Sequence, residues 1–209
     1  MTTFFTSDTH FGHTNILRYS NRPFKDVNHM NEEIIKRWNA LVTPEDTVYH
    51  LGDVALGKID DSLACVGRLN GHKILVDDGN HDRPFMSRGK AKYDYWVDRY
   101  LEVFEEMTNA SRIGISSGGH GFPVNISHYP YDGEGDHHKG GDRYADERLP
   151  DDETILIHGH THAEWAQKEM DSRVSRSKAG SLQIHVGMDA WHYKPVSEAQ
   201  VVDLIKEYS

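Results

Sequence analysis

Short apolar runs and apolar residues at helical spacing alternate along the first half of the chain. The runs at residues 2–7, 47–51 and 72–76 predict three buried strands. Between them, helical spacing predicts one helix from about residue 30 to 41, with Asn28 or Asn31 as its N-cap, and a second over 59–69. Strand–helix–strand order with short loops is typical of βαβ units. This half therefore predicts an α/β fold with a largely parallel sheet.

The second half has a different pattern, in which strands follow one another with glycine turns between them. Strands are predicted at residues 111–116, 122–127, 154–158, 174–177 and 182–186. Gly118-Gly119 and Ala179-Gly180 mark the turns of two hairpins. Ser197 and Gln200 have the spacing of a capping box and predict a C-terminal helix.

Residues 132–153 form one long segment without strand or helix periodicity, rich in Gly, Asp, Glu and His. Loop-length statistics favour a solvated surface loop. A flexible lid is the alternative, because the segment begins just after His128, which ends a predicted strand. A chain of 209 residues fits a single domain spanning residues 1–209.

Composition limits the class of protein. Hydrophobic residues make up 37% of the chain, which is enough for a packed core and excludes a disordered chain. No apolar run approaches the roughly 20 residues that a membrane span needs, and the N-terminus lacks the basic region of a signal peptide. The single cysteine, Cys65, lies in an apolar pattern and is interpreted as a buried core thiol. We therefore expect a cytoplasmic protein without a membrane partner.

The charge balance and the histidine content point to a particular chemistry. A net charge of −10 argues against strong nucleic-acid binding through a basic face. An acidic protein that processes phosphates needs a local source of positive charge, and bound divalent metals are the usual one. The chain has 15 histidines, far more than average usage predicts, and this excess indicates metal ligands among them.

Metal-ligating residue types follow the predicted strands at their carboxyl ends, where open α/β sheets bind ligands. They are Asp8, His10, Asp53, Asn80, His128, His160 and His162. Side chains two residues apart point the same way in extended backbone, so Asp8 should lie beside His10, and His160 beside His162. Glycine next to several of these residues would let the backbone turn sharply and approach a metal.

The order of these motifs is Asp-x-His, Gly-Asp, Gly-Asn-His-Asp, a strand-end His, and Gly-His-x-His. In this order they resemble the motif set of the calcineurin-like metallophosphoesterase superfamily, from Asp8 to His162. The stretches around Asp8 and Asp53 are similar to its small phage and bacterial members. The resemblance implies a two-sheet sandwich flanked by helices, with the metal site at the carboxyl ends of the strands.

The resemblance also implies a division of labour. One divalent ion would be held by Asp8, His10 and His162, the other by Asn80, His128 and His160, with Asp53 bridging both. A hydroxide shared by the ions would be the nucleophile. His81 would donate a proton to the leaving group, and Asp82 would orient it. Manganese is the expected metal, and iron, zinc or nickel would also accept mixed nitrogen and oxygen ligands.

Positions at which this sequence differs from the pattern of the family narrow the range of expected functions. The protein phosphatase branch has Asp and Arg shortly after Gly-Asp, whereas residues 54–57 read Val-Ala-Leu-Gly here, so a Ser/Thr protein phosphatase is not expected. Asp77 and Asp78 replace small apolar residues and would either raise metal affinity or cap the turn. His13 and Arg22 are tentative substrate contacts. For Arg22 on its own, a solvated side chain is the favoured alternative, although arginine suits oxyanions.

The leading function is hydrolysis of small phosphodiesters, with cyclic nucleotides as candidates. A phosphomonoesterase is second. A nuclease is third, because of the acidic charge and the lack of room for a DNA-capping domain. A scaffold that has lost catalysis is disfavoured, because His81 and every ligand position are intact. The expected partner is a small phosphoester substrate, and the sequence leaves the oligomeric state open.

Overall fold

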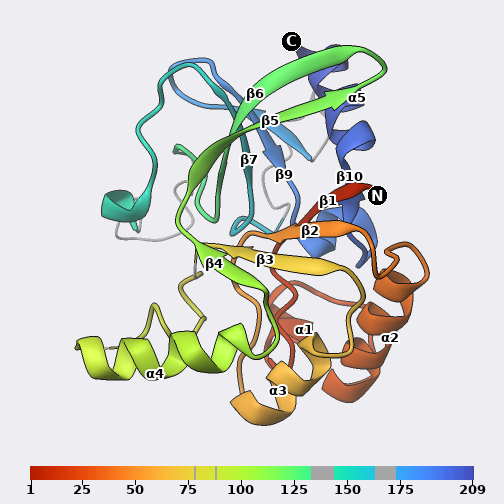
Figure 1. The fold of residues 1–209 in the computed structure, drawn as a ribbon, viewed down its shortest axis with the longest axis vertical. Coiled ribbons are helices and arrows are strands. Elements are labelled where there is room, and N and C mark those ends of the chain that lie inside the picture. Colours follow the sequence, from red (N-terminus) through yellow and green to blue (C-terminus); the bar gives the residue numbers. More distant parts are fainter. Residues whose placement is uncertain (78, 88, 133–143, 163–172) are drawn as a thin grey trace.

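The computed structural model describes residues 1–77, 79–87, 89–132, 144–162 and 173–209. Two five-stranded sheets pack against each other, and helices cover the outer face of the first sheet (Figure 1). This arrangement confirms the α/β class predicted from the sequence pattern and the two-sheet sandwich that the family resemblance implies. None of the helices in the described part of the chain has the length and apolar character that a membrane crossing requires.

The first sheet has the strand order β10-β1-β2-β3-β4. Its strands are β1 (Thr3–Thr6), β2 (Thr47–His50), β3 (His72–Val76), β4 (Glu106–Thr108) and β10 (Val196–Ser197). β1 to β4 run parallel, and β10 pairs antiparallel with β1. The helices between them are α1 (Ile16–Tyr19), α2 (Val27–Asn39), α3 (Ile59–Val66) and α4 (Lys90–Leu101). The predicted βαβ order and parallel sheet are thus confirmed.

The second sheet has the order β5-β6-β7-β9-β8. Its strands are β5 (Ser111–Ser117), β6 (His120–Ser127), β7 (Ile155–His158), β8 (Val174–Arg176) and β9 (Leu182–His185). Both predicted hairpins are present, as antiparallel β5–β6 and β8–β9 pairs, while β6, β7 and β9 pair in parallel. The chain ends in α5 (Glu198–Tyr208), which has the predicted capping box of Ser197 and Gln200.

Side chains of the first sheet pack into two separate core clusters, one on each face of the sheet. Phe4 packs into the cluster that α2 and α3 bury, whereas its neighbour Phe5 points into the cluster between the two sheets. Ile126 of β6 and Ile157 of β7 contribute to that second cluster from the opposite sheet. Successive side chains of a strand point to opposite faces, so one sheet contacts both layers.

Two features of the helices differ from the prediction. α2 begins at Val27 and is capped by Asp26, whose carboxylate accepts a hydrogen bond of 2.8 Å from the backbone N–H of His29. The prediction of Asn28 or Asn31 as the cap is wrong, because the first turn of this helix is polar and hides its true start. α4 and β4 were not predicted. Only Tyr100 of α4 is buried, so the helix lacks the apolar stripe that periodicity detects.

Cys65 is partly exposed rather than fully buried, although it packs against the helix-side core. The prediction of a buried thiol is therefore wrong in degree. Its position near the end of α3 leaves one side of the thiol open.

Half of the predicted lid, residues 133–143, lies outside the described residues. The described ends of that segment are held in place by carboxylates. Asp132 accepts from the backbone N–H of Lys178 at 2.7 Å, and Asp151 accepts from the hydroxyls of Ser177 and of Ser181, the latter at 2.6 Å. A short 3-10 helix, η1 (Ala145–Glu147), lies between these ends.

Candidate metal centre

The predicted ligands lie just beyond strands β1, β2, β3, β6 and β7, at the edge where the parallel strands end. The expected extended backbone around them is wrong. Asp8, His10, His160 and His162 have φ values of 58°, 51°, 70° and 49°, in the left-handed region. The chain turns back on itself after these strands, so Asp8 and His10 meet through a turn rather than through strand alternation, whereas His160 and His162 belong to two different groups of candidate ligands. Such conformations cost energy and gather at functional sites.

Asp8, His10 and His162 form a first cluster, in which one potential ligand atom from each residue lies within 4.8 Å of the others. Nε2 of His10 lies 3.3 Å from Nε2 of His162. Burial lowers the pKa of His10 well below its usual value, so its imidazole is neutral at neutral pH. Two imidazole nitrogens that converge on one point, beside a carboxylate, suit a shared cation.

Asp53, His128 and His160 form a second cluster, which meets the same 4.8 Å criterion. Nδ1 of His160 lies 3.2 Å from Nε2 of His128. Nδ1 of His128 donates to the backbone carbonyl of Leu51 at 2.7 Å, which leaves Nε2 as the lone-pair nitrogen facing the cluster. A backbone partner of this kind commonly fixes the tautomer of a metal-ligating histidine.

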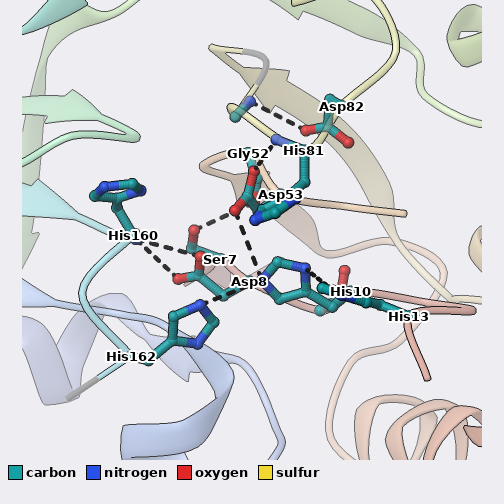
Figure 2. Close-up of polar contacts among 12 residues, drawn as sticks. Ser7, Asp8, His10, His13, Gly52, Asp53, His81, Asp82, His160 and His162 are labelled. Atoms are coloured by element: carbon teal, nitrogen blue, oxygen red, sulfur yellow. Dashed lines mark hydrogen bonds and ion pairs between the residues drawn. The ribbon is translucent and has the colours of Figure 1, made fainter. Parts of the chain in front are cut away.

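Asp53 lies between the clusters. Its Oδ2 is 3.6 Å from Nε2 of His10, and its Oδ1 is 3.7 Å from Nε2 of His128. The backbone N–H of His81 donates to Oδ1 at 2.9 Å. Figure 2 shows the side chains of Asp8, His10, Asp53 and His162 converging. One carboxylate therefore presents one oxygen to each group of histidines.

Buried polar groups of the two clusters show whether these residues suit metal ions. Asp8 is fully buried and Asp53 is 2% exposed, and burial raises the pKa of both carboxyl groups. Buried carboxylates are costly unless a cation compensates them. Asn80 Oδ1 is also buried and has no hydrogen-bond partner among the described residues. Imidazole, carboxylate and amide donors suit divalent transition metals, so the donor set fits two such ions.

Glycines let the ligand loops come together. A Cβ on Gly79 would lie 2.1 Å from Oδ1 of Asp53 and 2.4 Å from its backbone nitrogen, and a Cβ on Gly52 would lie 2.8 Å from Nδ1 of His128. Any side chain at either position would displace a candidate ligand. The close backbone approach predicted from the glycines is therefore a property of this site.

Asp189 is a residue of the site that sequence reasoning missed. Its carboxylate accepts from Nδ1 of His162 at 2.9 Å, and from Nε and Nη2 of Arg22 at 2.8 and 2.7 Å. Burial raises the pKa of Asp189, but His162 and Arg22 outweigh it and hold the value at about 2. The carboxylate thus keeps Nε2 of His162 directed at the first cluster. Its position four residues after the end of β9 was the available signal.

Arg22 and His13 both contact residues of the first cluster. Arg22 is 4% exposed and also donates to the backbone carbonyls of Asp8 and Thr9, at 2.6 and 3.1 Å. The solvated alternative for Arg22 is therefore wrong. His13 is buried, and its Nδ1 lies 3.3 Å from Nδ1 of His10. Burial, followed by the charge of Arg22, lowers the pKa of His13 to about 4.

His81 and Asp82 occupy different environments. The His81 ring is partly exposed, and its centroid lies 5.2 Å from that of His10. Burial is the main cause that lowers its pKa. Asp82 is fully buried and accepts from the backbone N–H groups of Val54 at 3.0 Å and Gly79 at 3.1 Å, and from the Tyr100 hydroxyl at 2.9 Å. Asp82 therefore joins the loops that follow β2 and β3.

Asp77 holds together segments that are distant in the sequence. Its carboxylate accepts from the backbone N–H groups of Ala110 and His128, at 2.6 and 3.3 Å, and from the Ser127 hydroxyl at 3.0 Å. Asp77 thus ties the end of β3 to the residue before β5 and to the end of β6, and these hydrogen bonds lie outside the turn that follows β3. Asp78 lies outside the described residues.

Asp189→Asn should weaken Mn²⁺ binding by about 10- to 100-fold, the usual cost of losing a partner that orients a metal-ligating histidine. The substitution removes the charge that holds both His162 and Arg22. Calorimetric titration with Mn²⁺ measures the effect, and Asp203→Asn, at an exposed position of α5, is the matched control. A folded Asp189→Asn protein with the affinity of the unsubstituted chain would contradict the assigned role.

The facing sheets and the two buried clusters of nitrogen and oxygen donors define a metallophosphoesterase-type α/β protein. The chain belongs to the calcineurin-like phosphoesterase family, whose family model matches residues 1–164. Asp189 lies beyond the matched region, although it contacts His162 within it.

Phage and bacterial proteins are similar over almost the whole chain. The gene 66 protein of Mycobacterium phage L5 is 37% identical, over 97% of this chain and 93% of its own length. The gene 66 protein of Mycobacterium phage D29 is 36% identical, over 90% and 88%. A solved structure of a protein of unknown function from Aquifex aeolicus covers 97% of this chain and 98% of its own, with 28% identity and a TM-score of 0.66.

Proposed function

We propose that this protein is a dinuclear metal-dependent phosphodiesterase that acts on small substrates, with cyclic nucleotides as candidates. The position of Asp53 carries the proposal, because its two oxygens face histidines of two separate clusters at 3.6 and 3.7 Å. When bound, two divalent ions would stabilise charge on the phosphoryl oxygens and activate water for attack. Manganese is the proposed metal.

We assign the residues of the site to three roles: metal ligands, a proton donor, and residues that hold these in position. Asp8, His10 and His162 would hold one ion, Asn80, His128 and His160 the other, and Asp53 both. His81 would donate a proton to the leaving oxygen, because its ring is partly exposed beside the first cluster. The hydrogen bonds of Asp82 support a role in holding the loop that carries His81. The buried contacts of Arg22 and His13 favour positioning of the ligands over direct contact with substrate.

Other functions are ranked below phosphodiester hydrolysis. A phosphomonoesterase is second, and the relative kcat/KM for a diester and a monoester distinguishes it from a phosphodiesterase. A nuclease is third, because a net charge of −10 opposes binding of a polyanion. A scaffold without catalysis is disfavoured by the intact donor set and by His81. We further propose a cytoplasmic, single-domain enzyme over residues 1–209.

Turnover of bis-p-nitrophenyl phosphate tests the proposal. The protein stripped of metal by a chelator should be inactive, and Mn²⁺ should restore turnover. Zn²⁺, Ni²⁺ and Fe²⁺ are compared in the same assay. The absence of turnover with any of these metals, in protein that calorimetry shows to bind them, would reject a phosphoesterase.

A diester should be hydrolysed with a higher kcat/KM than a monoester that has the same leaving group. A monoester is a dianion at neutral pH and calls for cations beyond the two metals, whereas Gly57 stands where the protein phosphatase branch has arginine. The net charge of −10 adds a repulsive background. The expected difference is roughly 1–3 kcal/mol in transition-state binding. Bis-p-nitrophenyl phosphate and p-nitrophenyl phosphate are the matched pair.

Among the described residues, two arginines are candidates for a cation that would reverse this preference for diesters. Arg22 is buried against Asp189, and Nη2 of Arg83 donates to the Gly57 carbonyl at 3.3 Å. Arg22→Ala and Arg83→Ala should leave the diester preference in place. A monoester preference that disappears in either variant would reject the diester assignment and identify the residue that binds the second charge.

A further inference from the structure

Three aromatic side chains gather beside the second metal cluster. The Tyr129 ring lies edge-on to His128 and His160, with centroid distances of 4.7 and 4.9 Å. The Tyr144 ring lies 5.3 Å from Tyr129 and 5.6 Å from His160. Phe85 completes the group, 6.0 Å from Tyr144 and 6.4 Å from Tyr129. We call Phe85, Tyr129 and Tyr144 the aromatic triad.

The triad is assembled from three separate parts of the chain. Phe85 comes from the loop after β3, Tyr129 directly follows the ligand His128, and Tyr144 precedes η1. Tyr144 has a φ of 56°, a left-handed conformation that a tyrosine adopts at a cost. A strained residue whose ring packs against a candidate metal ligand suggests a functional reason for its placement.

The members of the triad differ in exposure. Tyr129 is 2% exposed and forms the base of the group, whereas Phe85 and Tyr144 are partly exposed. The Tyr129 hydroxyl is buried and has no hydrogen-bond partner among the described residues. An unpaired buried hydroxyl is destabilising, and a ligand atom that accepts a hydrogen bond would satisfy it.

We propose that the aromatic triad is a substrate subsite in which Tyr144 stacks on a planar ring of the phosphoester, such as a nucleobase, and Phe85, whose ring is inclined by 74° to that of Tyr144, borders the subsite edge-on. The inference rests on the proposed function and adds the substrate class, nucleotide-type esters rather than purely aliphatic ones. Stacking on aromatic side chains tolerates any base, because every base has a π face. The centroid of the Tyr144 ring lies 5.6 Å from that of His160, so the subsite adjoins the second cluster.

A purely structural role makes a different prediction. If the triad only excludes water from the second cluster, loss of a ring will weaken every phosphate ligand alike. If the triad stacks on a ring, the loss falls on ligands that carry one. Adenosine 5′-monophosphate and ribose 5-phosphate separate these outcomes, because they share the sugar and the phosphate and differ in the base.

Calorimetric binding of both compounds to the Mn²⁺-loaded full chain tests the subsite. The unsubstituted protein should bind the nucleotide about tenfold more tightly than ribose 5-phosphate, and Tyr144→Ala should bring this ratio close to one. Tyr144→Phe, which keeps the ring, should retain the ratio. Tyr95→Ala removes an exposed tyrosine on α4 and should change nothing.

Two other binding results would overturn the subsite. Equal weakening of both compounds in Tyr144→Ala would leave only a packing role for the ring, and a ratio of one in the unsubstituted protein would exclude base recognition. The binding ratio is independent of turnover. Absence of bis-p-nitrophenyl phosphate hydrolysis in the unsubstituted protein, with the binding ratio as expected, would therefore reject the proposed catalysis and keep the subsite. Failure of both compounds to bind would reject the subsite, and the diester assay would still decide the proposed catalysis.

Discussion

Asp53→Asn is expected to lower phosphodiester turnover more than about 100-fold, beyond the upper end of the effects seen for supporting residues around metal sites. Asp53 is the residue whose oxygens face both clusters, and its negative charge offsets the mutual repulsion of two cations. Asparagine keeps the shape and one oxygen but loses that charge. Steady-state kinetics at saturating Mn²⁺, with metal content measured on the same samples, give the result.

Asp203→Asn is the control for the loss of one acidic residue, because Asp203 lies exposed on α5. Its turnover and metal content should match those of the unsubstituted protein. Near-native turnover of Asp53→Asn at saturating Mn²⁺ would contradict the two-metal proposal.

His81→Ala should reduce turnover of an alkyl or ribose ester by on the order of 10²–10⁴-fold, the range expected for loss of a general acid. On a nitrophenyl ester the loss should be much smaller, because that leaving group departs as a stable anion. Metal content should be unchanged. The backbone N–H of His81 donates to Asp53, and alanine keeps that hydrogen bond.

The comparison of the two esters separates proton donation from damage to the site. His120→Ala removes an exposed histidine on β6 and should leave both rates unchanged. Equal losses of His81→Ala on both esters, or a loss of metal, would show that His81 does not act as the acid.

Local sequence patterns anticipated a large part of the fold. Buried strands such as Thr3–Thr6 and His72–Val76 are short apolar runs, and the Ser197–Gln200 capping box is a contact within one helical turn. Interactions of this kind are encoded by neighbouring residues, so they can be recognised without knowledge of the fold. α4 escaped prediction for the same reason, since a helix that buries only Tyr100 leaves no periodic pattern.

The sequence by itself also determined which residues are candidate ligands, because ligand types at successive strand ends are a property of the chain order. Only the tertiary structure decided how they meet. The left-handed turns at Asp8 and His160 replace the expected extended backbone, and the pairing of β6 with β7 brings His128 to His160. The contact of Asp189 with Arg22 spans 167 positions. Contacts between residues so far apart depend on how the two sheets pack, and local propensity carries no information about that packing.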